Sequence, residues 1–322
     1  MREEFPSIEI ESISVRFSES TDETNASKKI SDYFHTNHHV LEIDNFLEEL
    51  PKAISIVKQP FWDLHWYYLV KKMKELTNVF FSGDGGDELF GGYVFRYKKF
   101  LELINENSTK KEKIISYLRC HERDWIPDQE IIFGQNCKFS WDEIYKIIEP
   151  FFDNDLSNLT QVFLADFNGK LLHNMQPLYN SIHREFNIKN VSPILNKQLI
   201  QLSCKISTES KFNSDNNVGK VPLRKILEKY DITHLLTTKK QGFSVNTVNM
   251  WNSYAKNIFS YYFDKSRLIE DKIINPIFIN KYSKRNNLDV RYVNKFLGLL
   301  ALEIWYRIFI SKDLNNDEKL QI

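Results

Sequence analysis

The segment Phe80–Tyr93, FFSGDGGDELFGGY, constrains more than any other feature how this chain can fold. The apolar run Asn78–Phe81 ends abruptly in glycine, which predicts a buried strand that runs into a tight turn. Glycines at this point allow positive φ angles and let the backbone approach a ligand closely. Three carboxylates, Asp84, Asp87 and Glu88, lie in the same turn and favour a Mg²⁺ ion that bridges carboxylates to phosphate oxygens. An acidic turn without a ligand is the alternative, but it does not explain so long a turn after a buried strand.

The charge balance argues against a protein that binds polyanions. The chain has 322 residues, enough for one large domain or two ordinary ones, with 43 Lys and Arg against 43 Asp and Glu. We therefore expect no nucleic-acid partner. Aromatic residues make up 14% of the chain, which favours a packed fold over disorder.

Cysteine usage and hydropathy indicate the cellular compartment of the protein. The three cysteines, Cys120, Cys137 and Cys204, are odd in number and widely spaced, so they fit neither a disulfide framework nor a zinc site. No apolar stretch approaches the roughly 18 residues of a membrane span, and no signal peptide precedes the fold. We expect a cytoplasmic protein without a membrane partner.

The first third of the chain alternates between strand and helix patterns. The expected elements are a strand Ile8–Phe17, a helix Glu23–Phe34, a strand His39–Ile43, a helix Phe46–Val57 capped by Asp44, a helix Trp66–Leu76 and a strand from Asn78. This order predicts an α/β fold with a parallel sheet covered by helices. Ligands of such sheets bind at the carboxyl ends of the strands, and Ser82–Asp87 follows one of those ends.

The rest of the chain is predicted to be mostly helical. Alternating patterns fade after Phe95, so we expect a nucleotide-binding α/β part over residues 1–99 and a mostly helical part over residues 100–322. The polar stretch Asn105–Lys113 predicts a solvated loop or a helix end. No repeat or low-complexity tract interrupts this part.

The Ser82–Tyr93 motif resembles the signature of the asparagine synthetases and their relatives, which include β-lactam synthetase. In that family an ATP-dependent domain adenylates a carboxylate and passes it to an amine. The resemblance covers nearly the whole chain. The further segments that carry it are Ser14–Phe17, Asp22–Glu23, His38–His39, Ser192–Asn196 ("PFLD"), Gly219–Arg224 ("GK..LR"), Lys240–Phe243 ("KQGF") and Leu300–Trp305 ("L.LE.W").

The resemblance implies a PP-loop ATPase type of sheet that is incomplete at its N-terminal side. Family members carry an SGG.DS pyrophosphate loop on a strand before the segment matched by Ile13–Phe17, whereas Met1–Ile10 has no glycine. The glutaminase domain and its N-terminal catalytic cysteine have no counterpart here either. Three interpretations stay open: a truncated or mis-started sequence, a short protein that borrows the loop from another chain, or an inactive relative.

The resemblance also implies roles for residues of the nucleotide site. Asp87 matches the family's magnesium ligand, and Asp84 stands where many members have Glu, near the nucleotide and the reacting carboxyl. Ser82, Gly83 and Val15 match positions that frame the adenosine. The alternative for Val15 is an ordinary core residue, because strand valines usually are.

Basic residues downstream match the phosphate side of the site. Lys240 corresponds to the family lysine that neutralises charge as pyrophosphate leaves, and a preorganised cation of this kind stabilises a transition state. The alternative is a solvated lysine on a loop. Lys220 and Arg224 are expected to be structural or to contact phosphate at the rim, and His183 is a weak acid/base candidate.

The chain departs from the family where the acceptor is handled. An ungapped count back from Ser192 places Asn180 on a family aspartate, Lys189 on a glutamate and Val191 on an arginine. Lysine presents only donors, so it cannot hold an ammonium-bearing substrate as a glutamate does. We therefore do not expect strict aspartate specificity.

Together these observations favour an asparagine synthase-like ligase that depends on ATP and Mg²⁺. Its substrates would be a small-molecule carboxylate, aspartate or an analogue, and ammonia or an amine. Another chain could supply the pyrophosphate loop or a glutaminase. The alternatives are a β-lactam-type synthetase with another acceptor and a non-catalytic partner or regulatory relative.

Overall fold

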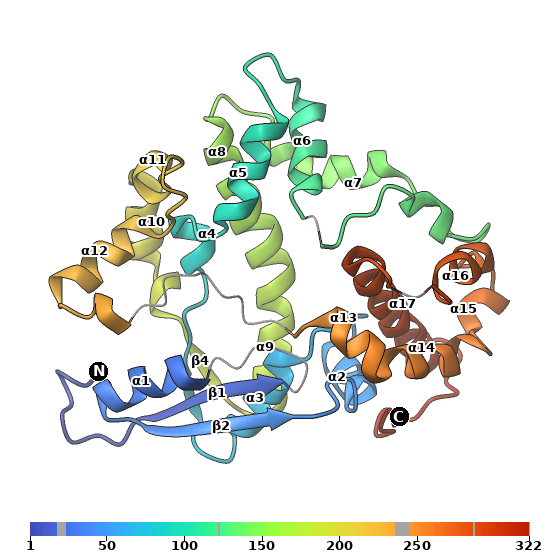
Figure 1. Cartoon of the computed structure of the whole chain (residues 1–322), viewed down its shortest axis with the longest axis horizontal. Coiled ribbons are helices and arrows are strands. Elements are labelled where there is room, and N and C mark those ends of the chain that lie inside the picture. The colour runs from blue at the N-terminus through green and yellow to red at the C-terminus, as the bar shows by residue number, and fades with distance from the viewer. Residues whose placement is uncertain (18–23, 122, 236–244, 286, 322) are drawn as a thin grey trace.

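The computed structural model describes residues 1–17, 24–121, 123–235, 245–285 and 287–321 (Figure 1). The strands are β1 (Glu11–Phe17), β2 (Asn37–Ile43), β3 (Val79–Phe81) and β4 (Lys189–Val191). The helices of the first 119 residues are α1 (Thr24–Phe34), α2 (Leu50–Val57), α3 (His65–Met73), α4 (Gly86–Phe90), α5 (Val94–Leu103) and α6 (Lys110–Arg119). Those that follow are α7 (Trp141–Ile148), α8 (Asn158–Ala165), α9 (Gln176–Glu185), α10 (Lys197–Lys205), α11 (Thr208–Lys211), α12 (Val221–Lys229), α13 (Thr247–Met250), α14 (Lys256–Phe263), α15 (Arg267–Glu270), α16 (Pro276–Tyr282) and α17 (Val290–Phe309).

All strand pairing in the described residues is parallel, as predicted, but it forms two separate pairs. β1 pairs with β2, with Glu11 opposite Asn37, and β3 pairs with β4, with Val79 opposite Lys189. The prediction of one sheet was therefore too simple. Strand β4 was missed because its three residues include Lys189 and Asn190, which give no apolar alternation.

The burial of β3 differs from the prediction. Val79 is 40% exposed and Phe81 is 47% exposed, although both were expected to lie in a buried strand. Strands of parallel sheets are normally covered on both faces. One side of β3 is therefore left open to solvent.

The predicted helices are present with shifted ends. The helix expected to start at Phe46 with an Asp44 cap begins at Leu50 instead, and its N-cap is Glu49. Pro51 fits this first turn because proline has no N–H to satisfy there. Helix α6 begins after Thr109, which forms a capping box with Glu112. The polar stretch Asn105–Lys113, predicted as a solvated loop or a helix end, therefore contains the N-terminal end of this helix.

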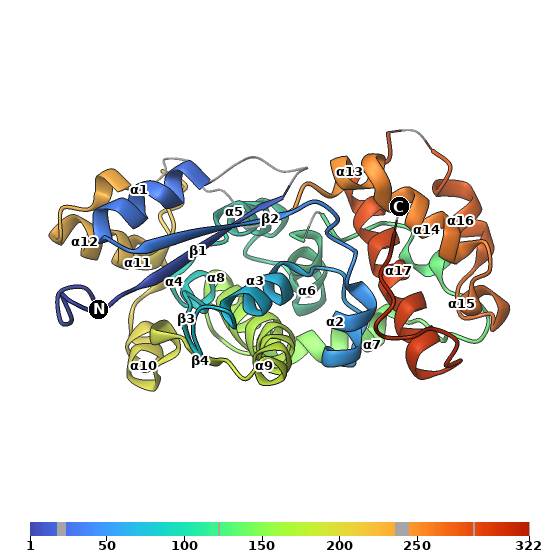
Figure 2. The ribbon, with the colours of Figure 1, turned by 90° about the horizontal axis from the view of Figure 1, so that it is seen from below.

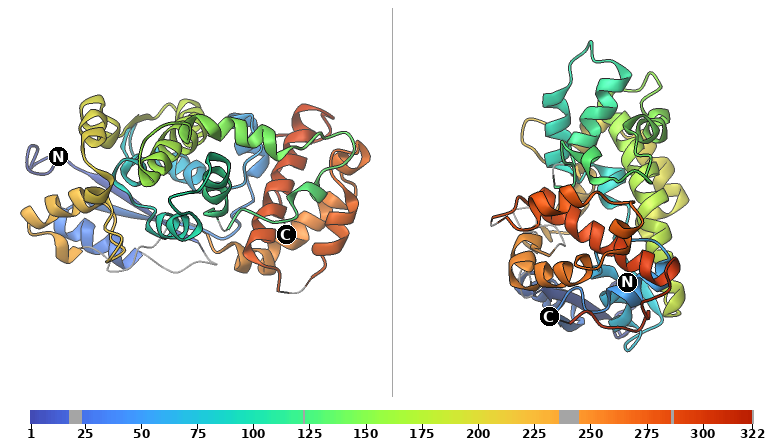
Figure 3. Two further views of the ribbon diagram at one scale, coloured as in Figure 1. Left: turned by 90° about the horizontal axis from the view of Figure 1, so that it is seen from above. Right: turned by 90° about the vertical axis from the view of Figure 1, so that its right-hand side faces the viewer.

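The core is built around α17 and joins distant parts of the chain. Fully buried residues of α17 such as Phe296 and Leu300 share one apolar cluster with Val15 and Phe17 of β1 and with Ile54 of α2. A second, smaller cluster lies beneath α5, α6 and α8. Figure 2 shows α1 and the helices α15 and α16 at opposite ends of the molecule. Helices α8 and α9 are joined end to end by a π-helical segment, Asp166–Met175, and together they form the long yellow-green helix in the right-hand view of Figure 3.

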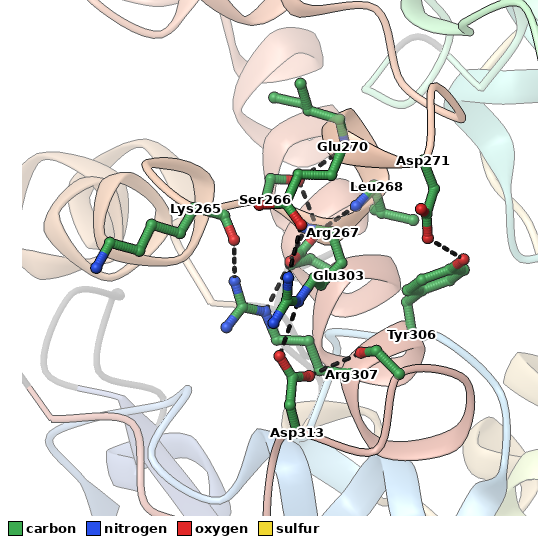
Figure 4. Close-up of polar contacts among 12 residues, drawn as sticks. Lys265, Ser266, Arg267, Leu268, Glu270, Asp271, Glu303, Tyr306, Arg307 and Asp313 are labelled. Carbon is green, nitrogen blue, oxygen red and sulfur yellow. Dashed lines mark hydrogen bonds and ion pairs between the residues drawn. The ribbon is translucent and has the colours of Figure 1, made fainter.

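The "L.LE.W" segment has a structural role at the C-terminal end of the fold. Glu303 of α17 is fully buried and accepts hydrogen bonds from Ser266 Oγ at 2.7 Å and from the backbone N–H groups of Arg267 at 2.9 Å and Leu268 at 3.1 Å (Figure 4). Arg307 Nε donates to the same carboxylate at 2.7 Å. Glu303 thus holds the start of α15 against α17.

Among the described residues, none of the helices combines the length and the apolar composition needed to cross a bilayer.

Candidate functional site

The glycine-rich turn connects β3 to the short helix α4 and needs its glycines for steric reasons. Gly85 is the N-cap of α4 with φ +85°, and an added Cβ there would lie 2.3 Å from Leu195 Cδ2. Gly91 ends the helix with φ +77°. At the start of the turn, Ser82 N donates to Val191 O at 3.0 Å and so continues the β3–β4 ladder. The turn is therefore fixed by backbone geometry as well as by its side chains.

Asp84 lies at the carboxyl end of β3 and is held from two sides. Ser82 Oγ donates to Asp84 Oδ2 at 3.0 Å, and Ser192 Oγ donates to the Asp84 backbone carbonyl at 2.8 Å. Burial raises the pKa of the Asp84 carboxyl, although the Ser82 hydroxyl and the nearby Asn190 and Gln176 amides oppose this rise. Gly83 beside it is exposed, and an added Cβ there would meet no atom within 4 Å. The space in front of Gly83 is open.

Asp87 forms an ion pair with a lysine from a distant segment. Lys220 Nζ lies 3.1 Å from Asp87 Oδ1, and Lys220 N donates to Phe90 O at 2.9 Å. A Cβ on Gly92 would lie 1.6 Å from the same carboxylate oxygen, so only glycine leaves room for it. The glycine-rich turn with Asp87 and the segment with Lys220, both expected near the phosphates, therefore lie in contact with each other.

The residues around Asp87 fit a magnesium ion that arrives with phosphate, but not one held by protein alone. In the described part of the chain, no group of three His, Cys, Asp or Glu side chains is arranged to hold a metal ion. Mg²⁺ usually binds through one or two carboxylates together with substrate phosphates. The Asp87 carboxylate could supply one such ligand, and the Lys220 ammonium marks this position as one that takes a positive charge.

A buried polar cluster lies behind the turn and was not foreseen. Glu88 accepts a hydrogen bond from Tyr93 Oη, and burial raises the pKa of the Glu88 carboxyl. Lys170 Nζ lies 3.6 Å from the centroid of the Tyr93 ring, and burial and the nearby Arg96 lower the pKa of Lys170 to about 8. Arg96 also donates to Asp166 Oδ1 at 2.7 Å. Glu88, which was expected among the magnesium-binding carboxylates, is instead buried in this cluster.

The other predicted site residues are placed as follows. The Val15 side chain is buried in the main apolar cluster, so any contact with a nucleotide would come from its backbone. Lys240 lies outside the described residues. Arg224 Nε donates to Gly219 O at 3.0 Å, which is a structural contact. His183 is buried, accepts from Trp66 Nε1 at 3.0 Å through Nε2, and has its pKa lowered by burial to about 4. These properties suit a packing residue better than a general acid or base.

The polar side chains that lie next to Asp84 are not the ones that the sequence predicted for the acceptor side of the site. Asn180 and Lys189, the substituted family positions, are exposed, whereas Val191 is half-buried in β4. Gln176 and Asn190 face Asp84 instead, and their buried Nε2 and Oδ1 atoms have no hydrogen-bond partner among the described residues. The sequence did not predict either residue, because neither stands at a position that was matched to the family. The signal that could have found them is their place beside positions that were matched.

The chain resembles known proteins over most of its length. A model of the asparagine synthase family matches residues 1–307. The chain is 24% identical over 311 residues to asparagine synthetase [glutamine-hydrolyzing] 1 of Bacillus subtilis, covering 85% of this chain and 48% of that protein. It is 37% identical over 99 residues to putative asparagine synthetase [glutamine-hydrolyzing] 2 of Methanocaldococcus jannaschii, covering 29% of this chain and 19% of that protein. The chain thus spans half or less of the curated relatives it matches.

Proposed function

The chain belongs to the asparagine synthase family, and on that premise we propose that it is an ATP-dependent ligase. It adenylates a small-molecule carboxylate, aspartate or an analogue, and passes the acyl group to ammonia or an amine. The observation that carries this proposal is the meeting of Asp84, Ser82 and the Asp87–Lys220 pair at the carboxyl end of β3. Parallel α/β sheets bind their ligands at this position.

Each residue has a role that follows from its surroundings. Ser82 and Gly83 frame the adenosine beside the open space at Gly83, and Val15 contributes backbone. Asp84, a half-buried carboxyl with a raised pKa, faces the reacting groups. Lys240 neutralises charge on the departing pyrophosphate. Asp87 would hold a magnesium ion, which would neutralise further phosphate charge.

The acceptor is not restricted to aspartate in this proposal. Lys189 carries the opposite charge to the family glutamate, and Gln176 and Asn190 present uncharged polar atoms next to Asp84. Buried polar atoms without a partner are costly unless a ligand satisfies them. A carboxylate substrate with its own amide or hydroxyl group would do so.

A further strand completes the site, either from elsewhere in the same polypeptide or from a partner chain that brings a pyrophosphate loop. Support comes from the two parallel pairs, which do not join within the described part of the chain, and from the exposed Val79 and Phe81 of β3. Isolated two-stranded sheets are marginal, and an unpaired edge accepts another strand. A non-catalytic relative that only recruits a partner has the same open edges, so activity must decide between the two.

The test is AMP formation from ATP by the protein isolated with its native partners. A panel of amino-acid carboxylates with ammonium should include one that stimulates AMP and pyrophosphate release. Lys240→Ala should lower kcat about 10²–10³-fold, the usual effect of losing one transition-state contact. Lys239→Ala, its neighbour, is the matched control and should change kcat less than about threefold. Absence of carboxylate-dependent AMP formation would favour the non-catalytic alternative.

A further inference from the structure

A cavity of about 650 Å³ lies away from the Asp84 turn, between the α5–α6 region and the start of α17. Its walls come from two parts of the chain that are far apart in sequence. The lining residues are Lys99, Leu103, Arg119, Arg123, Trp125, Asp289, Val290 and Arg291. Four of them are cationic and one is acidic. The volume is in the range of small-molecule sites.

The acidic residue of the lining pairs with one of the four cations. Asp289 caps α17 by accepting from Arg291 N at 2.9 Å, and its carboxylate pairs with Arg291 Nε at 2.9 Å. Arg119 and Arg123 have no ion-pair partner among the described residues. Asp63 lies outside the lining; burial opposes the lowering of the pKa of its carboxyl, which comes mainly from His65 and less from the Arg123 charge. In a chain with 43 basic and 43 acidic residues, this local excess of cations is a distinct asymmetry.

Packing fixes the position of one of these cations. The Arg119 guanidinium lies 5.5 Å from the centroid of the Trp125 ring and belongs to the last turn of α6, where a cation is favourable. Lys99 on α5 and Arg123 on the loop after α6 converge on the same space from other elements. The first turn of the 20-residue helix α17 also lines it, and helix N-termini favour anions.

We propose that this cavity binds a small molecule with two or more negative charges on oxygen, carried by phosphate or carboxylate groups. Guanidinium groups pair with both kinds of oxyanion through two parallel hydrogen bonds, and a lysine adds a point charge. The site is separate from the one proposed for ATP, since none of its lining residues belongs to the Asp84 turn or to the Lys220 segment.

Calorimetry on the full chain with inorganic tripolyphosphate and with citrate tests the proposal. At least one of them should bind with saturation at one site. Binding of tripolyphosphate alone assigns a phosphate ligand, citrate alone a polycarboxylate, and both a general oxyanion site. Arg119→Gln and Arg123→Gln should each weaken binding about tenfold, the order expected for a lost charge-assisted hydrogen bond. Arg119→Lys should weaken it less, because it keeps the charge.

Two control variants separate this cavity from other anion sites. Lys98→Gln removes an exposed cation next to the cavity that does not line it, and Lys220→Gln alters the candidate ATP site. Both should leave the affinity within about twofold of the parent value, because salt screens a charge that does not contact the bound anion. Lack of saturable binding by both anions overturns the proposal. So does a loss of affinity caused by Lys220→Gln, or an equal loss caused by Lys98→Gln. Thermal unfolding confirms that each variant is folded.

Discussion

The Lys220 ammonium lies 3.1 Å from Asp87 Oδ1, on the carboxylate that matches the family's magnesium ligand. Both side chains are about one-third exposed, so the pair is screened by solvent and contributes little to stability. Its consequence is chemical: Lys220 holds a positive charge where a divalent cation would bind. In the proposed function, the ammonium would turn from the carboxylate to a phosphate oxygen of the nucleotide.

Lys220→Gln should therefore tighten binding of a divalent cation at Asp87 in the absence of nucleotide. The glutamine removes a competing charge, and a partly exposed pair of this kind corresponds to about a fivefold change. Titration with Mn²⁺, followed by its paramagnetic resonance signal, measures the affinity. Asp87→Asn should weaken binding in either background. Unchanged or weaker Mn²⁺ binding in Lys220→Gln would show that the lysine does not compete.

Glu303→Gln should lower the free energy of unfolding by about 2–3 kcal/mol, because the buried carboxylate accepts charge-assisted hydrogen bonds that an amide replaces poorly. Its partners are the Arg307 guanidinium and the N–H groups at the start of α15. Urea unfolding followed by circular dichroism measures the change. Glu270→Gln, which alters an exposed pair with Arg267, is the control and should cost less than about 1 kcal/mol. Equal losses in both variants would refute the structural role of Glu303.

His183 should make the protein sensitive to acid between about pH 6.5 and pH 4. Its folded pKa is lowered to about 4, so the unfolded state binds more protons in this window and stability falls as the pH falls. We expect a contribution of up to about 2 kcal/mol. His183→Gln can still accept from Trp66 Nε1 and should flatten this pH dependence.

The control for that measurement is the exposed His173. His121 is half-buried, with its pKa lowered by burial to about 3, so some acid sensitivity should persist in His183→Gln. His173→Gln should leave the parent curve of unfolding free energy against pH unchanged. If His183→Gln and the parent give superimposable curves, His183 does not titrate as described.

Phe81 should promote association of the isolated chain. Its ring is 47% exposed on β3, beside an edge where no further strand pairs in the described residues. Apolar strand edges of this kind associate, and a charge on the strand opposes association. Phe81→Lys should reduce the average mass measured by light scattering at high protein concentration. Ile147→Lys, which charges a more exposed residue on helix α7, is the control and should leave the average mass unchanged. A parent chain that is monomeric at high concentration would contradict the prediction.

The elements that the sequence predicted well are those with strong local signals. The parallel strands Glu11–Phe17 and Asn37–Ile43 and the turn after Phe81 were anticipated because alternation, apolar runs and glycine act over a few residues. The start of α2 was wrong by four residues, since Phe46 and Leu47 are buried without being helical. The prediction that β3 is buried was also wrong, because the exposure of a strand depends on which other elements pack against it.

The sequence by itself determined the family, the parallel α/β start with its helical continuation, and the identity of the turn that carries Ser82, Asp84 and Asp87. Tertiary structure alone decided that Lys220 meets Asp87, that Gln176 and Asn190 face Asp84, and that four cations surround one cavity. The physical reason is the range of the interactions. Hydrogen-bond ladders, caps and glycine turns are set by neighbours in the chain, whereas charge pairing and burial depend on which distant segments the packed core brings together.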